Sequence, residues 1–106
     1  MSTNIGPITE AMYYVLLALV KPGYGYRLMQ AVSEVSDGRI QMGPGTLYGI
    51  LSRMLKEELI ALEEDDGRRK TYAITQSGKQ VLIDEYERLK TAVGDGVRIL
   101  GENGDV

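Results

Sequence analysis

The sequence contains no cysteine, no histidine and no tryptophan. Without cysteine and histidine, the chain cannot form a disulfide scaffold, a zinc finger, a Ser–His–Asp triad or a Cys–His nucleophile. Carboxylates alone can still bind Mg²⁺ or carry out acid–base chemistry, so these absences do not exclude every enzyme. We expect no cofactor and no resident metal ion.

Long apolar segments and signal sequences are also missing. The longest apolar run, residues 11–20, is too short to span a bilayer. Residues 1–7 have neither the basic start nor the apolar core of a signal peptide. We therefore expect a cytoplasmic protein with no membrane partner.

Positive charge is scarce as well. The net charge is −3 and the isoelectric point is about 4.9, whereas a strongly basic chain would indicate nucleic-acid binding. The 106 residues, 43% of them apolar, suit a single domain with a hydrophobic core. Any argument for DNA binding must therefore depend on where the 12 lysine and arginine residues lie.

Apolar residues at helical spacing predict three helices in the first half of the chain. The first follows Thr9, a suitable N-cap, and ends at residues 21–23, where proline cannot continue a helix. The second begins at residues 24–26 and ends at residues 36–38. The third begins at residues 43–45 with proline in its first turn. Its apolar stripe is formed by Leu47, Ile50, Leu51, Met54 and Leu55.

The spacing changes to alternation after the third helix. Residues 60–62 and 72–74 alternate apolar with small or polar side chains, and Asp66-Gly67 between them is a strong hairpin signal. Helical spacing resumes after Thr75. We therefore predict a mostly α fold with a small β-hairpin, in which residues 1–75 form a winged helix-turn-helix domain.

Residues 76–106 are predicted to form a C-terminal helix for dimerisation. Gly94 and Gly96 weaken a helix, so we expect a frayed tail from about residue 94. Apolar residues recur on this helix in steps of four and three, which is typical of a coiled-coil seam. The seam would either cover the core of its own domain or pack against a second copy. We favour a homodimer whose interface residues are Leu82, Tyr86, Leu89 and Val93.

Several segments together resemble the PadR-type family of winged-helix transcriptional regulators. They are residues 43–48 (Gly-Pro-Gly-Thr-Leu-Tyr), residues 11–19 followed by Gly25-Tyr26, and residues 68–75 followed by Gly78. The resemblance covers residues 8–93 and points to the compact branch with a short C-terminal helix. It implies a homodimeric repressor, not an enzyme, that is often released from DNA by a small organic molecule.

The chain departs from the family pattern at three points, of which the short C-terminal helix with Gly94 and Gly96 is one. Glu58 stands where a glycine usually closes the recognition helix, which predicts a differently shaped helix end. Some compact members bind flat aromatic drugs between tryptophans, and this chain has no tryptophan. Tyr13, Tyr14 and Tyr86 are instead the candidates for an effector pocket at the dimer interface, although aromatic residues at helical spacing more often belong to a core.

The third helix and the hairpin supply the predicted DNA-binding residues. An α-helix fits the major groove, where polar and guanidinium side chains reach base edges, and cations on a protruding loop reach phosphates. The alternative is a solvated surface, and the acids at residues 63–66 would repel phosphate. The predicted DNA-binding residues are Arg39, Thr46, Tyr48, Ser52, Arg53, Arg68, Arg69 and Lys70.

The predicted function is sequence-specific regulation of transcription. We expect a repressor that binds a palindromic operator in double-stranded DNA as a homodimer and is released by a small aromatic effector. The alternative is a winged-helix module that binds a partner protein, which the acidic isoelectric point favours. A hydrolase with paired carboxylates ranks last, because its candidate acids, Asp84, Glu85 and residues 63–66, lie in adjacent runs.

Overall fold

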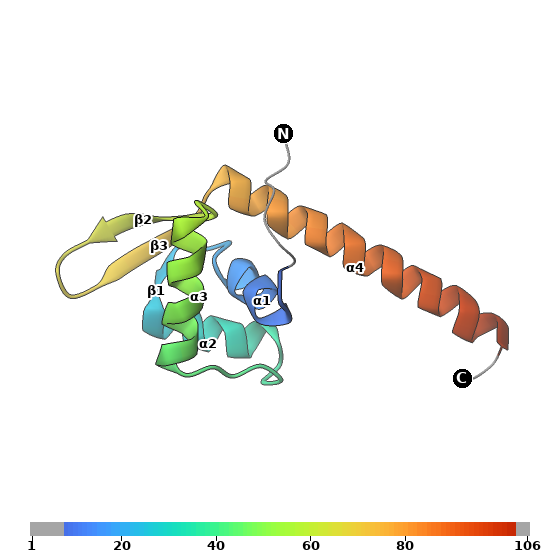
Figure 1. Cartoon of the computed structure of the whole chain (residues 1–106). Coiled ribbons are helices and arrows are strands. Elements are labelled where there is room, and N and C mark those ends of the chain that lie inside the picture. The colour runs from blue at the N-terminus through green and yellow to red at the C-terminus, as the bar shows by residue number, and fades with distance from the viewer. Residues whose placement is uncertain (1–7, 104–106) are drawn as a thin grey trace.

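The computed structural model describes residues 8–103. Helices α1, α2 and α3 form a bundle, the β2–β3 hairpin projects from one side of it and α4 extends from the other (Figure 1). This is the predicted mostly helical winged-helix arrangement. The elements are α1 (Glu10–Ala18), β1 (Gly23–Tyr24), α2 (Gly25–Val35), α3 (Pro44–Lys56), β2 (Ile60–Asp65), β3 (Lys70–Ile74) and α4 (Gln76–Asn103).

Local sequence signals set the helix ends. The Thr9 hydroxyl accepts a hydrogen bond from the Met12 backbone N–H at 3.1 Å, which confirms the predicted N-cap of α1. Pro44 lies in the first turn of α3, where its missing N–H costs nothing. After α2, Asp37 and Gly38 adopt φ angles of 52° and 78°, and the chain turns there toward α3.

The end of α3 differs from the sequence-based expectation. Glu58 adopts a φ of 61°, the left-handed conformation that glycine favours. Its N–H donates to the Leu55 carbonyl at 3.0 Å. The next N–H, of Leu59, donates to the Met54 carbonyl at 2.9 Å, which completes a Schellman motif. The missing glycine therefore does not reshape the helix end, and the strain is typically about 1–2 kcal/mol.

Strand β1 was not predicted. The sheet has the antiparallel order β1-β3-β2. Gly23 pairs with Tyr72 and Tyr24 with Thr71, so α2 begins only at Gly25, after this short pairing. Two residues are too few to show an alternating pattern, and for this reason the segment resembled a helix start.

The core lies between the three bundled helices, the base of the hairpin and the first turns of α4. The α4 backbone approaches the bundle closely at Gly78, where a Cβ atom would overlap the Leu59 carbonyl oxygen. The fully buried large side chains are Met12, Val15, Leu16, Leu19, Leu28, Val32, Leu47, Leu51, Met54, Leu59 and Ile60.

Helix α4 is longer than its glycines indicated. It passes through Gly94 and Gly96 and continues to Asn103, in contrast to the predicted fraying from about residue 94. The rest of that tail, residues 104–106, and residues 1–7 of the predicted first domain lie outside the described residues. Val81 and Leu82 are buried against the bundle, and beyond them the helix projects away from it (Figure 1). Most of α4 therefore forms an arm.

Candidate nucleic-acid interface

A groove of about 830 Å³ separates α3 from the β2–β3 hairpin, hereafter the wing. Tyr48 and Ser52 line it from α3, and residues 67–70 line it from the wing. Thr46 is exposed nearer the start of α3, outside this lining. The remaining lining residues are Tyr24, Gly25, Tyr26, Leu55 and Tyr72.

Tyr48 is placed by a glycine on the neighbouring helix. Its ring stands directly over Gly25, where a Cβ atom would overlap the Tyr48 hydroxyl. The side chain is still 47% exposed, so one side packs on α2 while the other faces solvent. Because Gly25 has no side chain, α3 can present Tyr48 at the groove without burying it.

Asp66 shapes the turn of the wing. Its carboxylate accepts hydrogen bonds from the N–H groups of Arg69 at 2.7 Å and Arg68 at 3.0 Å. These two bonds lower the pKa of Asp66, because they stabilise its charged form. Gly67 adds a φ of 88°, which a residue with a side chain rarely adopts. One of the acids that would repel phosphate thus holds the turn that carries the cations.

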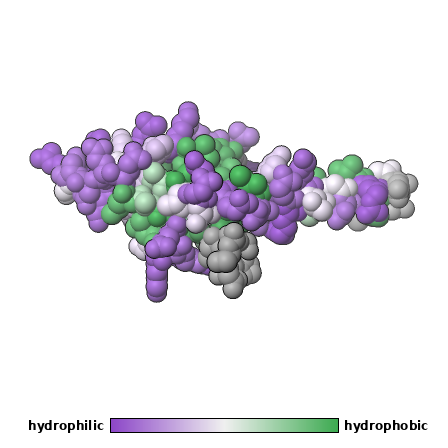
Figure 2. All heavy atoms as spheres, turned by 90° about the horizontal axis from the view of Figure 1, so that it is seen from above, coloured by the Kyte–Doolittle hydropathy of each residue, from purple (hydrophilic) through white to green (hydrophobic). Residues whose placement is uncertain are grey.

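The wing carries charges of both signs, and Asp65 pairs directly with Lys70 across the hairpin. The cations Arg68, Arg69 and Lys70 line the groove, whereas none of the acids at residues 63–66 does. The Arg69 guanidinium lies over the Tyr24 ring, 4.4 Å from its centroid, and this cation–π contact holds it beside β1. In Figure 2 the far end of the wing, at the left, is mostly hydrophilic. The groove is therefore locally cationic although the chain is acidic.

Two predicted DNA-binding arginines lie outside the groove lining. Arg53 forms an ion pair with Glu57, with Nε 2.9 Å from Oε1, and its Nη1 donates to the Met12 sulfur at 3.2 Å. Arg39 donates from Nη2 to the Tyr14 hydroxyl at 2.6 Å. Both side chains are held by contacts with α1, so the structure does not bring them together with the wing cations.

Tyr24 and Tyr26 at the groove were not among the predicted site residues. Tyr26 is 62% exposed in the first turn of α2, and its hydroxyl accepts a hydrogen bond from the Gln30 amide at 3.4 Å. Tyr24 lies beneath Arg69 because β1 pairs with the wing. The sequence offered only a Tyr-Gly-Tyr run, and nothing in its spacing pointed to that pairing.

The predicted dimer residues divide between the core and the surface of α4. Leu82 is only 9% exposed and packs in the core of its own domain, whereas the sequence analysis had assigned it to the dimer interface. The rest of the seam continues along the projecting arm, where Leu89 is half-buried and the others are exposed. The apolar residues of the seam that lie on the arm are Tyr86, Leu89, Val93, Val97 and Leu100.

The three candidate effector-binding tyrosines lie near the junction of α1 and α4. The rings of Tyr13 and Tyr14 meet edge to face, with centroids 5.6 Å apart. Burial is the main cause that raises the pKa of Tyr13, and the nearby Tyr14, Tyr86 and Glu85 raise it further. Tyr13 of α1 therefore lies within electrostatic reach of Tyr86 of α4.

Neither a membrane-spanning helix nor a metal site is found among the residues that the structure describes. Across residues 8–103, no helix combines the length and apolar composition needed to cross a membrane. In that part of the chain, no group of three or more acidic, histidine or cysteine side chains is placed to hold a metal ion.

Residues 15–84 match the model of the transcriptional regulator PadR-like family. The chain belongs to this family. Family members are transcriptional regulators and not enzymes, and the match runs from the second half of α1 through α2, α3 and the wing to the start of α4. The resemblance of the recognition helix and wing to PadR-type regulators is thereby confirmed.

Individual relatives agree with this assignment. The transcriptional regulator YqjI of Escherichia coli (strain K12) is 30% identical over 67 residues, which are 63% of this chain and 32% of that protein. A solved PadR family transcriptional regulator from Eggerthella lenta is 35% identical, with a TM-score of 0.66, and the match covers 87% of this chain and 81% of that one. This PadR-like chain spans only 24% to 32% of the length of the first curated relatives it matches.

Proposed function

We propose that this PadR-like protein is a sequence-specific repressor that binds a palindromic operator in double-stranded DNA as a homodimer in the cytoplasm. Family membership supports DNA-binding regulation, and the groove between α3 and the wing is the observation that carries the proposal. Polar side chains of α3 form one wall of this groove, and three cations of the wing form the other. The helix thus offers groups for base edges and the wing offers groups for phosphates.

The residues of the groove divide between these two roles. We assign base contacts to Thr46, Tyr48 and Ser52, because they lie exposed on α3. Phosphate contacts are assigned to the wing cations at residues 68–70 and carry no sequence information of their own. Arg39 and Arg53 are assigned to the support of α1 and α3, since their side chains already bind Tyr14 and Glu57.

The arm of α4 is proposed to form the two-fold interface. Tyr86 is 49% exposed and Val93 64% exposed, so the apolar row on the arm faces solvent in the single chain. Burying such a row against a second copy removes it from water. One winged-helix domain recognises only a few base pairs, and a dimer doubles that number. The two half-sites then lie about 10 base pairs apart or a multiple of that.

Release from DNA is proposed to follow the binding of a small aromatic effector. Tyr13, Tyr14 and Tyr86 are grouped beside the arm, where a flat molecule would stack on tyrosine rings. A molecule bound there would alter how the arm meets the bundle and hence the distance between the two reading helices. Its effect on operator affinity should disappear in Tyr86→Ala, and an undiminished effect would place the effector elsewhere.

Selection from random DNA tests the proposed function directly. The purified protein is mixed with random duplex DNA, and the retained fragments are sequenced. We expect a palindrome to be enriched, and we expect a version with one half-site scrambled to bind at least tenfold more weakly. Affinity should also fall at least tenfold between low and physiological salt, because several phosphates are neutralised.

A second candidate function is a winged-helix module that binds a partner protein. The observation in its favour is the net charge of −3, together with the exposed acids of the wing at residues 63–66. The selection from random DNA also distinguishes these two functions. A protein that enriches no sequence and does not retard random duplex DNA at low salt would refute the repressor and favour the protein-binding module.

A further inference from the structure

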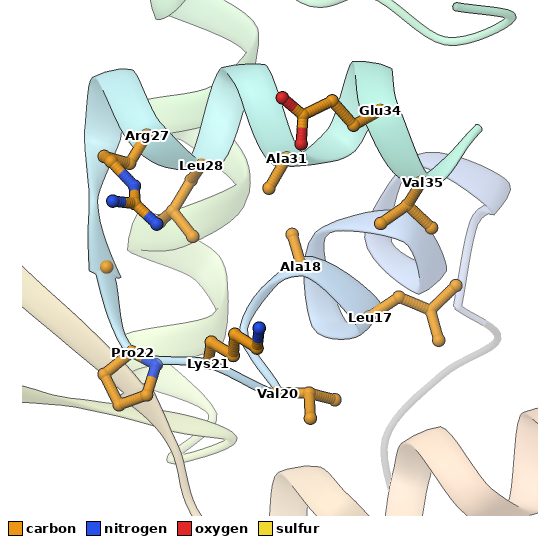
Figure 3. A pocket seen from close by; sticks show the side chains of 11 residues that line it. Leu17, Ala18, Val20, Lys21, Pro22, Arg27, Leu28, Ala31, Glu34 and Val35 are labelled. Atoms are coloured by element: carbon orange, nitrogen blue, oxygen red, sulfur yellow. The ribbon is translucent and has the colours of Figure 1, made fainter. Parts of the chain in front are cut away.

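The groove between α3 and the wing is rich in tyrosine. Four of the seven tyrosines of the chain line it, and they are Tyr24, Tyr26, Tyr48 and Tyr72. A second groove, of about 350 Å³ between α1 and α2, has no aromatic residue in its lining (Figure 3). Aromatic rings are therefore concentrated on the surface that also carries the wing cations.

Two of these tyrosines are open to solvent. Tyr26 is 62% exposed and Tyr48 is 47% exposed, although an aromatic side chain stabilises a protein most when its large apolar surface is buried. Tyr26 lies in the first turn of α2, and the Tyr48 ring stands over the preceding residue, Gly25. The two side chains therefore reach the same groove from two helices and leave apolar ring surface free for a ligand.

Arg69 adds a third flat group to the groove. Its guanidinium lies over the Tyr24 ring, 4.4 Å from the centroid, and Arg69 lines the groove as well. Nucleic-acid bases stack on guanidinium planes as they do on aromatic side chains. Because residues 24–26 are consecutive, the positions of Arg69, Tyr48 and Tyr26 follow one another along a short stretch of backbone.

The charge of the groove is of one sign. Among the residues that the structure describes, its lining contains three cations at positions 68–70 and no acid. The α1–α2 groove differs here too, since Glu34 lines it together with Lys21 and Arg27 (Figure 3). The groove beside the wing thus combines attraction for phosphates with exposed flat groups.

Flat groups of this kind suit unpaired bases better than base pairs. In a duplex the bases are stacked on one another and present their edges in the grooves, so an exposed tyrosine ring finds no free base face. In an unpaired strand the faces are free, and stacking on aromatic side chains is tolerant of sequence. The exposed rings therefore indicate a ligand other than the operator duplex.

We propose that this groove also binds a single unpaired DNA strand. Its bases stack on Tyr26, Tyr48 and the Arg69 guanidinium, and its phosphates lie against the cations at residues 68–70. The strand and the operator occupy the same groove, so they compete for the protein. Binding of the strand does not rest on the proposed operator function, because stacking reads no sequence.

Fluorescence anisotropy with labelled oligo(dT), about 12 nucleotides long, tests the role of the bases. The comparison is a strand of the same length made of abasic units, which keeps the phosphates and removes every base. We expect oligo(dT) to bind at least tenfold more tightly at physiological salt. Equal affinities would show that only phosphates are bound and would overturn the proposal. Tighter binding of oligo(rU) than of oligo(dT) would assign the groove to RNA and also overturn it.

Tyr26→Leu and Tyr26→Phe are a matched pair at an exposed position. Leucine removes the ring, whereas phenylalanine removes only the hydroxyl. We expect Tyr26→Leu to weaken oligo(dT) binding at least fivefold and Tyr26→Phe to keep the wild-type affinity, because stacking needs only the ring. Equal losses in the two variants would show that the hydroxyl binds a phosphate, and stacking would be refuted. An unchanged affinity in Tyr26→Leu would refute it as well.

Two further measurements locate the strand on the protein. In NMR spectra, oligo(dT) should shift the ring protons of Tyr26 and Tyr48 upfield through the ring currents of stacked bases, and the abasic strand should not. Lys70→Gln should weaken both strands, whereas Lys56→Gln, which removes a cation outside the groove lining, should leave both affinities unchanged. Shifts confined to tyrosines outside the groove, or equal losses in the two lysine variants, would place the strand elsewhere and refute the site.

Competition with duplex DNA separates this inference from the proposed function. We expect oligo(dT) to displace the selected operator from the protein, and a complex containing both DNAs would refute the shared groove. A protein that prefers oligo(dT) to the abasic strand but enriches no palindrome would refute the repressor and support strand binding. A protein that binds its operator without that preference would overturn strand binding and leave the repressor intact.

Discussion

Glu58 occupies a backbone position for which glycine is the better residue. Its φ of 61° strains a side-chain-bearing residue, while glycine loses more chain entropy on folding. We predict that Glu58→Gly increases the free energy of unfolding by about 0.5–1 kcal/mol, measured by denaturant titration. Glu58→Ala removes the carboxylate but keeps the Cβ atom, so it should give no increase. An equal gain in both variants would identify the charge, not the backbone, as the cause.

Gly25 and Gly78 differ in what an added methyl group meets. In Gly25→Ala only the end of the Tyr48 side chain has to move, whereas in Gly78→Ala the Leu59 backbone blocks the new atom. We predict that Gly78→Ala lowers the free energy of unfolding by about 1–3 kcal/mol and that Gly25→Ala lowers it much less. Gly25→Ala should instead weaken operator binding about tenfold by displacing Tyr48. Thermal unfolding and DNA titration of both variants measure the two effects.

Substitutions in α3 and in the wing are expected to change DNA affinity in different ways. Tyr48→Ala should weaken the selected operator by about 1–3 kcal/mol and random DNA much less, because a base contact is lost. Arg69→Ala should weaken both DNAs about equally and reduce the salt slope by about one. Titrations with both DNAs at several salt concentrations measure these changes. A neutral Tyr48→Ala in a folded protein would show that another face of α3 reads the bases.

The turn of the wing should respond to acid. The backbone N–H groups of Arg69 and Arg68 lower the pKa of Asp66 in the folded chain. The turn is therefore stabilised above the ordinary carboxylate pKa of about 4, and this stabilisation is lost as the pH falls through the lowered pKa. Amide exchange at Arg69, followed by NMR, should accelerate in that range. Asp66→Ala should show the faster exchange already at neutral pH, and a wild-type rate would exclude this role.

The order and type of most elements followed from periodicity and turn residues, whereas contacts between distant residues did not. The Asp66-Gly67 signal located the hairpin because a turn is determined by its own residues. Strand β1 was missed because its pairing with Tyr72 leaves no local pattern. Leu82 was assigned to the dimer because helical spacing does not show where a helix leaves its own core. The structure brings the predicted cations of the wing to the groove but not Arg39, since Tyr14 holds it.

For the whole molecule, the arm of α4 determines assembly in the proposed function. Leu89→Asp or Val93→Asp would bury an unpaired carboxylate in the two-fold interface, which costs several kcal/mol. We predict a folded monomer by analytical ultracentrifugation and circular dichroism, with loss of operator binding. Val93 is the stricter test, because at 64% exposure it supports nothing in its own chain.

Thr91→Asp is the matched control for these variants. Thr91 is exposed and lies on the side of α4 opposite Val93, so this variant should remain dimeric. If Val93→Asp also stays dimeric and binds the operator normally, another surface joins the two copies.

The pairing of β1 with the wing also determines the order in which the molecule folds. The β2–β3 hairpin joins neighbouring segments, and such pairings form within microseconds. The pairing of Gly23 with Tyr72 joins residues about 50 positions apart, so a long loop must close before it can contribute. We therefore expect the wing to form as a hairpin before it is attached to the domain. Its attachment, and with it the cationic wall of the groove, should come late in folding.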